Sequence, residues 1–470
     1  MTMSNSHRGG REDKPNIRSI SMDEAKTARL TKSALGFGVM FSVFTFFLIQ
    51  ITLIQDATTW KVKLRHVLSI SQWAPNRDTS VAITCNYSHQ LYDICTINGP
   101  TLLDHASSTF FTLGPHTQDK CPIPMKIRPY PRKGDKTAMS NVNEVTLTAA
   151  PPKLSCAVTH RTPAIVFSAA GYTGNFFHEI DENFIPLFIT INSLFPNQDV
   201  TLVVMDGNIW WFQKYAELLS AFTPHRLIID TKNLSTVHCF PSATIGLIKH
   251  GPVIIDPTLL QPHPKTLHDF RALLDKTYAK VDTTPNHQNG KNSKPRLTLI
   301  DRRGSVSRVM SNQGEVIKVA EELGFNVHVL DPTRNNSMAN VYRVVHDSHV
   351  LLGVHGAGLT NFLFLRPGSV LLQVVPIGLE WSSRTYYENP PKLLGLEYIE
   401  YKIEANESSL SERYGANSLV VKDPSAFHKH IWSKQRIYLK EQNVGIDLVR
   451  FRKCLTNAYE KAKIFMSRVN

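Results

Sequence analysis

The chain has 470 residues, of which 42% are hydrophobic and 19% are charged. This length supports two globular domains with cores of their own, together with additional terminal segments. Its 52 lysines and arginines outnumber its 39 aspartates and glutamates, which gives a formal net charge of +13. A basic surface suits an anionic polymer, a membrane surface or a phosphorylated small molecule. Because the chain carries no zinc-finger, homeodomain or RNA-binding signature, nucleic acid is not an expected partner.

The N-terminal segment predicts a membrane anchor. Residues 1–32 are polar and charged, which is typical of a disordered cytosolic tail. Residues 33–55 contain no charged side chain, and a helix of that length, at about 1.5 Å per residue, crosses a bilayer core of roughly 30 Å. Basic residues in front of the run favour a cytosolic N-terminus; they are Arg8, Arg11, Lys14, Arg18, Lys26, Arg29 and Lys32.

Two observations qualify this prediction. Lys61, Lys63 and Arg65 on the far side of the run weaken the charge asymmetry. A cleaved signal peptide is the alternative, but its apolar region spans about 7–15 residues and ends at small residues. Residues 52–56 supply no such site. We therefore expect a single-pass type II membrane protein with a signal-anchor and a luminal globular region.

The cysteines and the glycosylation motifs agree with a luminal chain. All six cysteines follow residue 55, and an even number permits disulfides, although six cysteines allow 15 pairings. No His/Cys group has the spacing of a zinc site. Four Asn-X-Ser/Thr acceptors, which predict a glycoprotein, also follow the anchor: Asn86, Asn233, Asn335 and Asn406.

The first half of the luminal region is predicted to be one α/β lobe. Residues 56–155 are rich in Thr, Ser, Pro and Asn and are predicted to be a luminal stem that grades into the catalytic region. Residues 156–285 then alternate between apolar runs and helical spacing. We expect strands at 164–168, 200–205 and 226–229, one or two strands within 237–255, and helices at 176–194, 209–222 and 267–280. The polar stretch 282–295 is predicted to be a linker.

Residues 286–445 predict a second lobe of the same kind, followed by a closing helix within 446–470. We expect strands at 296–300, 326–330, 349–352, 369–375 and 398–403, and helices at 313–323, 338–347, 424–439 and 446–466. Alternating strands and helices favour parallel sheets covered on both faces. The predicted fold class is therefore α/β, with two Rossmann-like domains facing a cleft and ligands at the carboxyl ends of the strands.

A glycine-rich turn in the second lobe is a candidate phosphate site. Residues 353–361 read GVHGAGLTN and join the strand at 349–352 to a helix beginning at Leu359. Glycines let the backbone approach a ligand, and a helix start offers N–H groups and a positive dipole end. A tight turn without a ligand is the alternative.

Three arginines strengthen the phosphate interpretation. Arg302, Arg303 and Arg308 follow the strand at 296–300 in the same lobe, and guanidinium groups pair well with phosphate oxygens. A solvated basic loop is the alternative for these arginines. The complete candidate anion site is formed by Arg302, Arg303, Arg308, His355, Gly356, Ala357, Gly358, Leu359 and Asn361.

A histidine and three acids at the start of the predicted helix 176–194 are a candidate proton-transfer site. His178 and Glu182 are four residues apart and share one helix face, while Asp181 lies three residues from His178. Glu179 is the third acid. A histidine oriented by a carboxylate suits a general base. A half-buried histidine beside acids that serve the helix dipole is the alternative.

Three stretches together resemble the plant family 61 glycosyltransferases: residues 171–188 (GYTGNFFHEIDENFIPLF), 300–316 (IDRRGSVSRVMSNQGEV) and 353–376 (GVHGAGLTNFLFLRPGSVLLQVVP). The resemblance extends over roughly residues 155–466. It implies a GT-B architecture, with the nucleotide sugar held mainly by the C-terminal lobe and the acceptor in the cleft, near Gly174 and Asn175. It also implies inversion at the anomeric carbon without a metal or other cofactor. The chain has no Asp-X-Asp after a strand to hold a divalent cation, so arginines and helix dipoles would stabilise the diphosphate.

The chain departs from the family pattern at one place. Relatives usually read His-Asp-Phe-X-Asp, whereas this chain has Glu179 and Glu182 at the two aspartate positions. The carboxylates remain but reach one methylene further, which leaves open which of Glu179, Asp181 and Glu182 assists His178.

The resemblance implies a Golgi enzyme that transfers a pentose, xylose or arabinofuranose, from a UDP-sugar to a hydroxyl of the xylan backbone. The arginines and the glycine turn would hold the diphosphate, and His355 would contact the phosphates or the ribose. The alternatives are an N-glycan β1,2-xylosyltransferase, a protein O-GlcNAc-type transferase and a non-catalytic polysaccharide-binding Golgi protein. Assembly with itself or with other Golgi glycosyltransferases stays open.

Overall fold

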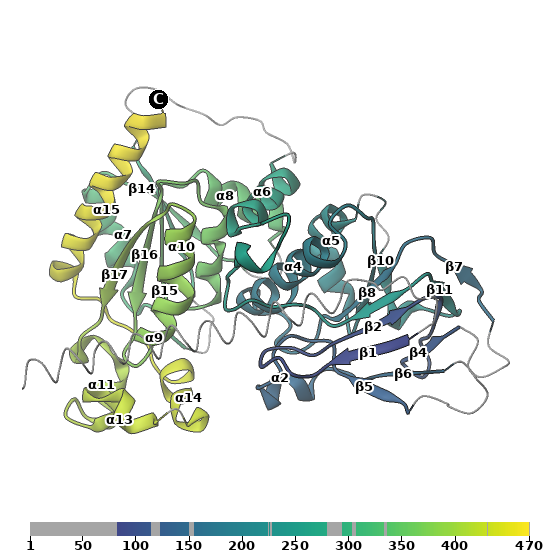
Figure 1. Ribbon diagram of the computed structural model, residues 1–470. Coiled ribbons are helices and arrows are strands. Elements are labelled where there is room, and N and C mark those ends of the chain that lie inside the picture. The colour runs from purple at the N-terminus through teal and green to yellow at the C-terminus, as the bar shows by residue number, and fades with distance from the viewer. Residues whose placement is uncertain are drawn as a thin grey trace, which may run out of the picture. The chain divides into compact units, whose positions relative to one another are not determined.

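Three β-sheets organise the chain, two in an N-terminal lobe and one in a C-terminal lobe (Figure 1). The structure is a computed structural model that describes residues 82–113, 123–149, 155–223, 225, 228–279, 294–302, 307–332, 336–429 and 431–469. We call the described residues up to 279 the N-terminal lobe and those from 294 the C-terminal lobe. Both belong to one compact unit, Arg77–Asn470. The mixed α/β class predicted from the sequence is confirmed.

Several predictions fall outside the described residues. They include the cytosolic tail at 1–32, the anchor at 33–55, Arg303 and the acceptor Asn335. Among the residues that are described, no helix is both long and apolar enough to cross a bilayer.

A six-stranded central sheet forms the middle of the N-terminal lobe. Its spatial order is β1-β2-β12-β8-β9-β10, with β12, β8, β9 and β10 parallel and the first pair antiparallel. The strands span β1 (Ala82–Asn86), β2 (Ile94–Asn98), β8 (Ala164–Ser168), β9 (Thr201–Met205), β10 (Ile228–Asp230) and β12 (Ala243–Ile245). The predicted strand at 164–168 is thereby confirmed, and β9 and β10 lie within two residues of their predicted starts.

A second, outer sheet packs against the central sheet. Its order is β5-β6-β4-β3-β11-β7, and its strands are β3 (Thr101–Asp104), β4 (Thr109–Thr112), β5 (Met125–Ile127), β6 (Val145–Ala149), β7 (Val158–Thr159) and β11 (His238–Phe240). Buried side chains of both sheets, such as Val166 and Leu147, form one core. Strands between 56 and 155 were not predicted from the sequence, because strands of three to five residues are too short to show a clear alternation.

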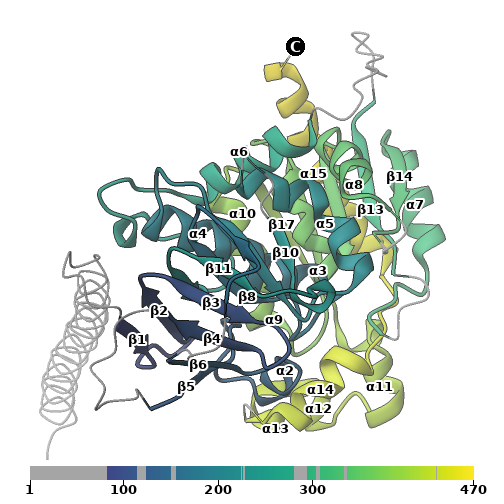
Figure 2. The same cartoon turned by 90° about the vertical axis from the view of Figure 1, so that its right-hand side faces the viewer.

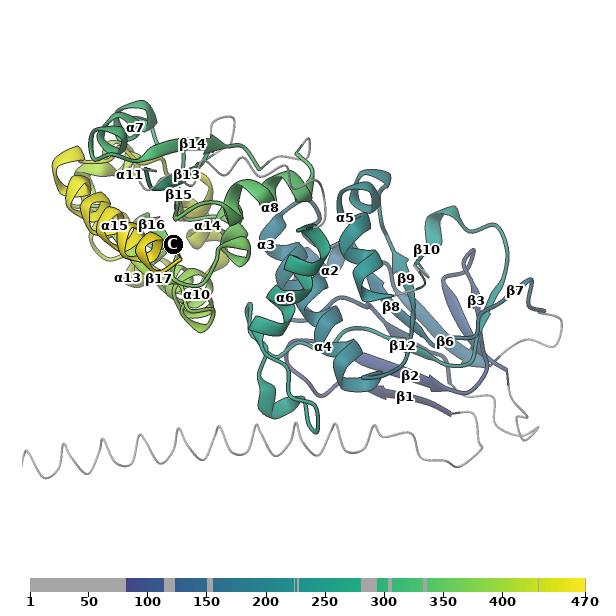
Figure 3. The same cartoon turned by 90° about the horizontal axis from the view of Figure 1, so that it is seen from above.

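Helices cover the other face of the central sheet (Figure 3). They are α4 (Ile185–Leu194), α5 (Ile209–Phe222) and α6 (Leu267–Tyr278). The predicted helix at 176–194 is present, but its middle is a π-helix: α3 (Phe176–His178) leads into η1 (Glu179–Phe184) and then into α4. Single-turn π-helical segments occur often at functional sites. The short elements of this lobe are α2 (Lys136–Ser140), η2 (Thr231–Asn233) and η3 (Pro257–Leu259).

The sheet of the C-terminal lobe is entirely parallel, in the order β14-β13-β15-β16-β17. Its strands are β13 (Arg296–Ile300), β14 (Asn326–Leu330), β15 (Val350–Val354), β16 (Val370–Val375) and β17 (Glu397–Lys402). Figure 1 shows α7 (Gln313–Glu322) and α15 (Leu448–Val469) on one side of this sheet, with α8 (Met338–His346) and α10 (Asn389–Leu393) on the other. A parallel sheet needs this cover because both of its faces are apolar.

Shorter helices complete the C-terminal lobe. The chain has η4 (Ala357–Phe364), α9 (Glu380–Ser383), η5 (Arg384–Glu388), η6 (Ala405–Glu407), α11 (Ser409–Tyr414), α12 (Leu419–Lys422), α13 (Pro424–His428) and α14 (Trp432–Lys440). Helices α11 to α14 gather at one end of the lobe (Figure 2). The prediction of one helix at 424–439 was wrong, because Lys429 takes a left-handed conformation (φ 42°) and ends α13 before α14 begins.

Two disulfides lie within the described residues. Cys85 and Cys95 face each other across the antiparallel pair β1–β2, and Cys156 is joined to Cys239. Cys454 is a free thiol on α15. The sixth cysteine, Cys121, lies outside the described residues.

Candidate active site

The strand order of the C-terminal sheet locates a ligand crevice. From β13 the chain passes to β14 on one side and then returns to β15 on the other side. The connections that leave β13 and β15 therefore diverge, and such a switch point opens a crevice at the carboxyl ends of the two strands. Arg302 follows β13 by two residues and Gly356 follows β15 by two residues. The fold thus brings Arg302 and Arg308, two of the three predicted arginines, next to Gly356 of the predicted glycine turn.

The glycines of the turn provide room for neighbouring groups. Gly356 has a φ of +155°, and a Cβ atom on it would lie 2.4 Å from Nη1 of Arg302 and 3.5 Å from Nη1 of Arg308. A Cβ on Gly358 would lie 2.6 Å from Cγ2 of Ile300. Gly356 therefore allows the guanidinium groups to approach the backbone, and Gly358 allows η4 to pack closely on β13.

The two described arginines form an electropositive pair. Nη2 of Arg302 donates to the Ser307 carbonyl (3.1 Å), and Nη1 of Arg308 donates to the His355 carbonyl (3.0 Å). Nε of Arg308 is buried without a hydrogen-bond partner among the described residues. Burial, together with the neighbouring Arg302, lowers the pKa of Arg308 to about 10, and burial also lowers the pKa of Arg302. Two neighbouring cations with little solvent are unfavourable alone, and a bound anion would relieve that repulsion.

His355 lies beneath this pair and is buried. Its Nδ1 atom is 2.8 Å from Nε2 of Gln373 and 3.1 Å from the hydroxyl of Ser383. The amide nitrogen can only donate, so Nδ1 accepts and the ring proton lies on Nε2. Burial and the two arginines hold the pKa of His355 well below its usual range, so the ring is neutral. The described contacts of the ring go to the lobe's own side chains, which makes His355 a support for the turn.

The remaining predicted members of the anion site surround the turn. The Leu359 side chain is buried, and its N–H donates to the Gly356 carbonyl at 2.9 Å. Nδ2 of Asn361 donates to the Gly358 carbonyl at 2.7 Å. Ala357 begins η4 and is half-buried.

The N-terminal lobe has a switch point of its own. The chain leaves β8 toward β9 and β10 and later returns to β12 on the opposite side of β8. The candidate proton-transfer residues follow β8 on α3 and η1, and Lys249 follows β12 by four residues. Both lobes therefore carry their predicted site residues at the position where an open parallel sheet binds ligands.

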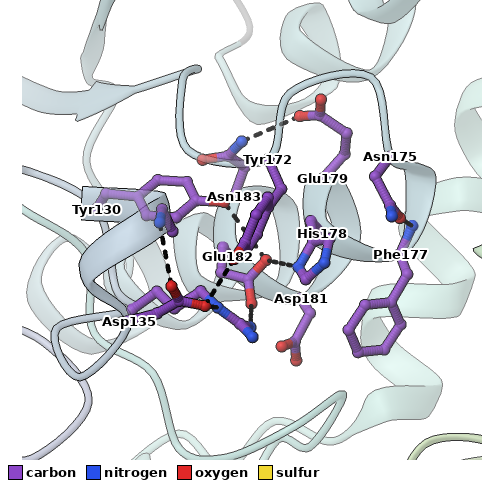
Figure 4. A network of polar contacts seen from close by, with 12 residues as sticks. Tyr130, Asp135, Tyr172, Asn175, Phe177, His178, Glu179, Asp181, Glu182 and Asn183 are labelled. Atoms are coloured by element: carbon purple, nitrogen blue, oxygen red, sulfur yellow. Dashed lines mark hydrogen bonds and ion pairs between the residues drawn. The ribbon is translucent and has the colours of Figure 1, made fainter. Parts of the chain in front are cut away.

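Glu182 is the centre of a buried polar network (Figure 4). Its Oε2 atom lies 2.8 Å from Nδ1 of His178, and its Oε1 atom lies 2.6 Å from Nη1 of Arg132. Lys249 is 3.4 Å from Oε1 of Glu182 and 2.6 Å from Oδ2 of Asp181. Burial favours the neutral acid, but Lys249, His178 and Arg132 outweigh it and hold the pKa of Glu182 well below its usual range.

The ionised Glu182 determines the tautomer of His178. A carboxylate can only accept hydrogen bonds, so Nδ1 of His178 carries a proton and donates it. In the neutral ring, Nε2 then keeps its lone pair and can accept a proton from another molecule. The His178 side chain is 16% exposed whereas that of Glu182 is fully buried. His178 is therefore the member of this pair that a substrate can reach.

Glu179 and Asp181 hold the backbone and side chains around the site in place. The Glu179 carboxylate accepts from the Gly174 N–H (2.9 Å) and from the Trp211 indole (2.8 Å), and burial raises its pKa to about 7. Asp181 binds Lys249 and the Val253 N–H (2.6 Å). Asp181 and Glu182 share Lys249, but among the three acids Glu182 alone pairs with His178.

The predicted acceptor-side residues lie at the start of this segment. Asn175 caps α3 by accepting a hydrogen bond from the Phe177 N–H. Gly174 borders a cavity of about 560 Å³ between the lobes, and Asn361 borders it from the opposite lobe. The full lining is Gly174, Phe176, Trp210, Lys214, Tyr215, Asp331, Pro332, Met338, Val341 and Asn361.

Two tyrosines of η5 connect the candidate sites of the two lobes. The Tyr387 hydroxyl donates to the Gly356 carbonyl (2.9 Å). The Tyr386 ring packs on Phe177, with ring centroids 4.8 Å apart, and Phe177 precedes His178. The anion site and the His178–Glu182 pair are thereby adjacent across the interface between the lobes.

Sequence reasoning missed several of these residues. Arg132, Lys249, Gln373 and Tyr387 complete the two sites, and none was singled out by a sequence motif. A basic residue is expected wherever acids are buried together, but the sequence does not tell which one.

Three of the four predicted glycosylation acceptors are described. Asn233 and Asn406 are exposed and Asn86 is half-buried. Among the described residues, no group of three or more His, Cys, Asp or Glu side chains is arranged to hold a metal ion.

The fold and the site define an α/β protein in which a candidate anion site lies next to a histidine–carboxylate pair. The model of the glycosyltransferase 61 family matches residues 176–372. The xylan glycosyltransferase MUCI21 of Arabidopsis thaliana is 38% identical over 400 residues, which cover 81% of this chain and 80% of that protein. The chain therefore belongs to the glycosyltransferase 61 family, as the sequence resemblance predicted.

Two further relatives come from Oryza sativa subsp. japonica. The β-1,2-xylosyltransferase XYXT1 is 34% identical over 396 residues, which cover 80% of this chain and 83% of the relative. The α-1,3-arabinosyltransferase XAT3 is 34% identical over 379 residues, which cover 80% of this chain and 65% of the relative.

Proposed function

We propose that this protein is an inverting GT-B glycosyltransferase that transfers a pentose from a UDP-sugar to a hydroxyl of a xylan chain. The observation that carries the proposal is the His178–Glu182 pair, which is connected through Tyr386 and Tyr387 to the glycine turn and its two half-buried arginines, Arg302 and Arg308. The His178–Glu182 pair provides a base for an acceptor hydroxyl. The two arginines provide positive charge for a leaving diphosphate.

The reaction is a single displacement. Nε2 of His178 takes the proton of the acceptor hydroxyl, and the hydroxyl oxygen attacks the anomeric carbon. The bond between that carbon and the UDP oxygen breaks, and the electron pair leaves with the diphosphate. Arg302, Arg308 and the backbone around Gly356 stabilise the charge that develops there. Attack from the face opposite to UDP inverts the configuration at the anomeric carbon.

The choice of a pentose and of xylan rests on the relatives. Their names describe a xylan glycosyltransferase, a β-1,2-xylosyltransferase and an α-1,3-arabinosyltransferase. All three align with about four-fifths of this chain. UDP-xylose and UDP-arabinofuranose are therefore the two donors to be compared.

A donor and acceptor screen tests this proposal. The purified region after the anchor is incubated with UDP-xylose, UDP-arabinofuranose and UDP-GlcNAc, each with xylo-oligosaccharides or a trimmed N-glycan, and products are identified by mass spectrometry. We expect a pentose on the xylo-oligosaccharide. A product on the N-glycan alone, or GlcNAc transfer, would replace the proposed activity by one of its alternatives.

Variants separate an enzyme from a non-catalytic binding protein. His178→Ala should abolish transfer, because the base that takes the proton from the acceptor is lost. His225→Ala is the matched control, since this histidine side chain is 75% exposed and pairs with Asp199 at the surface. Glycan binding without transfer by the wild-type chain would favour the non-catalytic alternative.

We also propose that residues 33–55 anchor the protein in the Golgi membrane and that the catalytic region is luminal. The two disulfides and the exposed sequons Asn233 and Asn406 support this orientation, because both features belong to an oxidising secretory compartment. Protease protection of the catalytic region in sealed microsomes, with a mass shift after N-glycosidase treatment, is the expected result. If the protease digested the catalytic region in sealed microsomes without detergent, the catalytic region would face the cytosol and the proposed orientation would be wrong.

A further inference from the structure

Trp381 is a large aromatic residue exposed beside the candidate active site. It belongs to α9 and is 72% exposed, whereas Trp211 of the N-terminal lobe is fully buried. The next residues of α9, Ser382 and Ser383, approach the ring of His355 under the glycine turn. A single exposed indole is not unusual by itself. Its position next to these residues makes it available to a ligand of the candidate site, because an indole offers a large apolar face and a polar N–H group.

Trp381 begins a line of rings that crosses from one lobe to the other. Its centroid lies 5.9 Å from that of Tyr386, and Tyr386 lies 4.8 Å from Phe177. Phe177 lies 5.2 Å from His178, whose ring is 4.5 Å from Tyr172. In Figure 4, Tyr172 and Phe177 flank His178 on opposite sides. We call these five rings (Trp381, Tyr386, Phe177, His178 and Tyr172) the aromatic strip.

Polar groups accompany the strip. The guanidinium group of Arg132 lies over the Tyr172 ring, 5.3 Å from its centroid, and the Tyr172 hydroxyl donates to Asp135 at 3.0 Å. Tyr386, His178 and Tyr172 are half-buried, whereas Phe177 is buried and joins them from below the surface. A surface that combines flat aromatic faces with hydrogen-bonding groups suits a carbohydrate, because a pyranose ring has apolar C–H faces and polar edges.

We propose that Trp381 forms a remote subsite for an acceptor glycan, in which it stacks on a sugar other than the one that reacts at His178. This inference deepens the proposed function and rests on it for the position of the reactive hydroxyl. The ligand class is a β-linked pyranose chain long enough to extend from His178 to Trp381. A single sugar or a very short chain would lie at His178 and leave the indole uncovered.

The length of the acceptor provides the test. Transfer kinetics are measured on xylo-oligosaccharides of one to six units at saturating donor, for the wild type, Trp381→Ala and Trp381→Phe. For the wild type we expect kcat/KM to rise with length. Trp381→Ala should lose roughly three- to tenfold of kcat/KM on long acceptors through KM, with kcat kept. The shortest acceptors should be unaffected, and Trp381→Phe should restore most of the loss.

Val449→Ala is the matched control, because Val449 is an apolar residue of the same lobe that is 77% exposed on α15. This variant should match the wild type at every length. Equal losses on short and long acceptors, or no loss at all, would overturn the proposal. A weaker affinity of Trp381→Ala for UDP alone would also overturn it, since the indole would then stack on the nucleobase.

A binding measurement keeps the inference separate from the proposed function. Calorimetric titration of the same oligosaccharides needs no transfer. The wild type could bind longer oligosaccharides more tightly, and Trp381→Ala could weaken that binding, although the protein transfers no pentose. This result would refute the proposed activity and leave the subsite intact. Binding that is insensitive to Trp381 in an active enzyme would refute the subsite alone.

Discussion

Nδ1 of His178 lies 2.8 Å from Oε2 of Glu182, and both residues lie in the helix that runs from α3 into the π-helical η1. The carboxylate is fully buried, ionised and bound to Arg132 and Lys249, so it cannot itself reach an acceptor. Its effect passes through the histidine, whose proton it holds on Nδ1. In the proposed reaction Glu182 is thus a positioning residue, and His178 is the group that would contact substrate.

The first prediction concerns the charge of Glu182. Glu182→Gln keeps the size of the side chain but removes the charge that fixes the tautomer of His178, so kcat should fall roughly a hundredfold or more. The affinity for UDP should be unchanged, because the anion site lies in the other lobe. Kinetics and UDP titration would separate the two effects.

A buried acid elsewhere controls for this substitution. Glu407 is buried in the C-terminal lobe, where it binds Arg450 and Tyr401. Glu407→Gln should destabilise the fold to a comparable degree and leave kcat of the folded fraction intact. If it lowers kcat as much as Glu182→Gln does, the assigned role of Glu182 is incorrect.

The second prediction concerns the cationic pair. Arg308→Gln should weaken UDP binding roughly ten- to a hundredfold, because it removes a charge-assisted contact to phosphate. The free energy of unfolding without ligand should change by about 1 kcal/mol or less, since the loss of the hydrogen bond to His355 is offset by relief of repulsion from Arg302. Thermal melts with and without UDP would show this. Arg452→Gln, at an exposed ion pair with Glu322, should change neither quantity, and a UDP affinity unaffected by Arg308→Gln would remove the arginine from the site.

Local sequence patterns were sufficient for the elements that carry the site. The strand β13 has its predicted bounds. The glycine turn joins a strand to a helix as predicted, but β15 extends to Val354 and the helix is a 3-10 helix that begins at Ala357 rather than at Leu359. These features depend on neighbours in sequence, and so does the four-residue spacing of His178 and Glu182. The sequence could therefore predict the elements on which the candidate site residues lie.

The partners that decide the chemistry depend on tertiary packing. Arg132 is 50 residues from Glu182 in sequence and Lys249 is 67 residues from it, so no local pattern joins them. Tyr386 and Tyr387 lie on a helical segment that also contains Pro390 and Pro391 and lacks a simple helical period. That segment was absent from the predicted elements. The role of His355 was also beyond sequence reasoning, because only the fold shows that its ring is buried under the turn.

The third prediction uses the pKa of Glu179, which burial raises from its usual value near 4.5 to about 7. The folded protein then holds a proton on Glu179 that the unfolded chain has released, so this group's stabilisation is complete below about pH 4.5 and declines as the pH rises to about 7. Integrated over that window, the contribution is about 3 kcal/mol. Denaturant unfolding of the wild type and of Glu179→Gln at several pH values would measure it. Their difference in free energy should shrink as the pH rises, whereas a constant difference would show that Glu179 keeps an ordinary pKa.

The last prediction concerns the space over the glycine turn. Gly356→Ala places a Cβ atom 2.4 Å from Nη1 of Arg302, so the guanidinium group must move away from the crevice. We expect UDP affinity and kcat/KM to fall at least tenfold, because a charge-assisted contact of about 1.5–3 kcal/mol is lost. Gly314→Ala is the matched control. Nothing lies within 4 Å of its added Cβ, and alanine should stabilise α7 by roughly 0.5–1 kcal/mol. If Gly356→Ala bound UDP as tightly as Gly314→Ala, the turn would not be part of the diphosphate site.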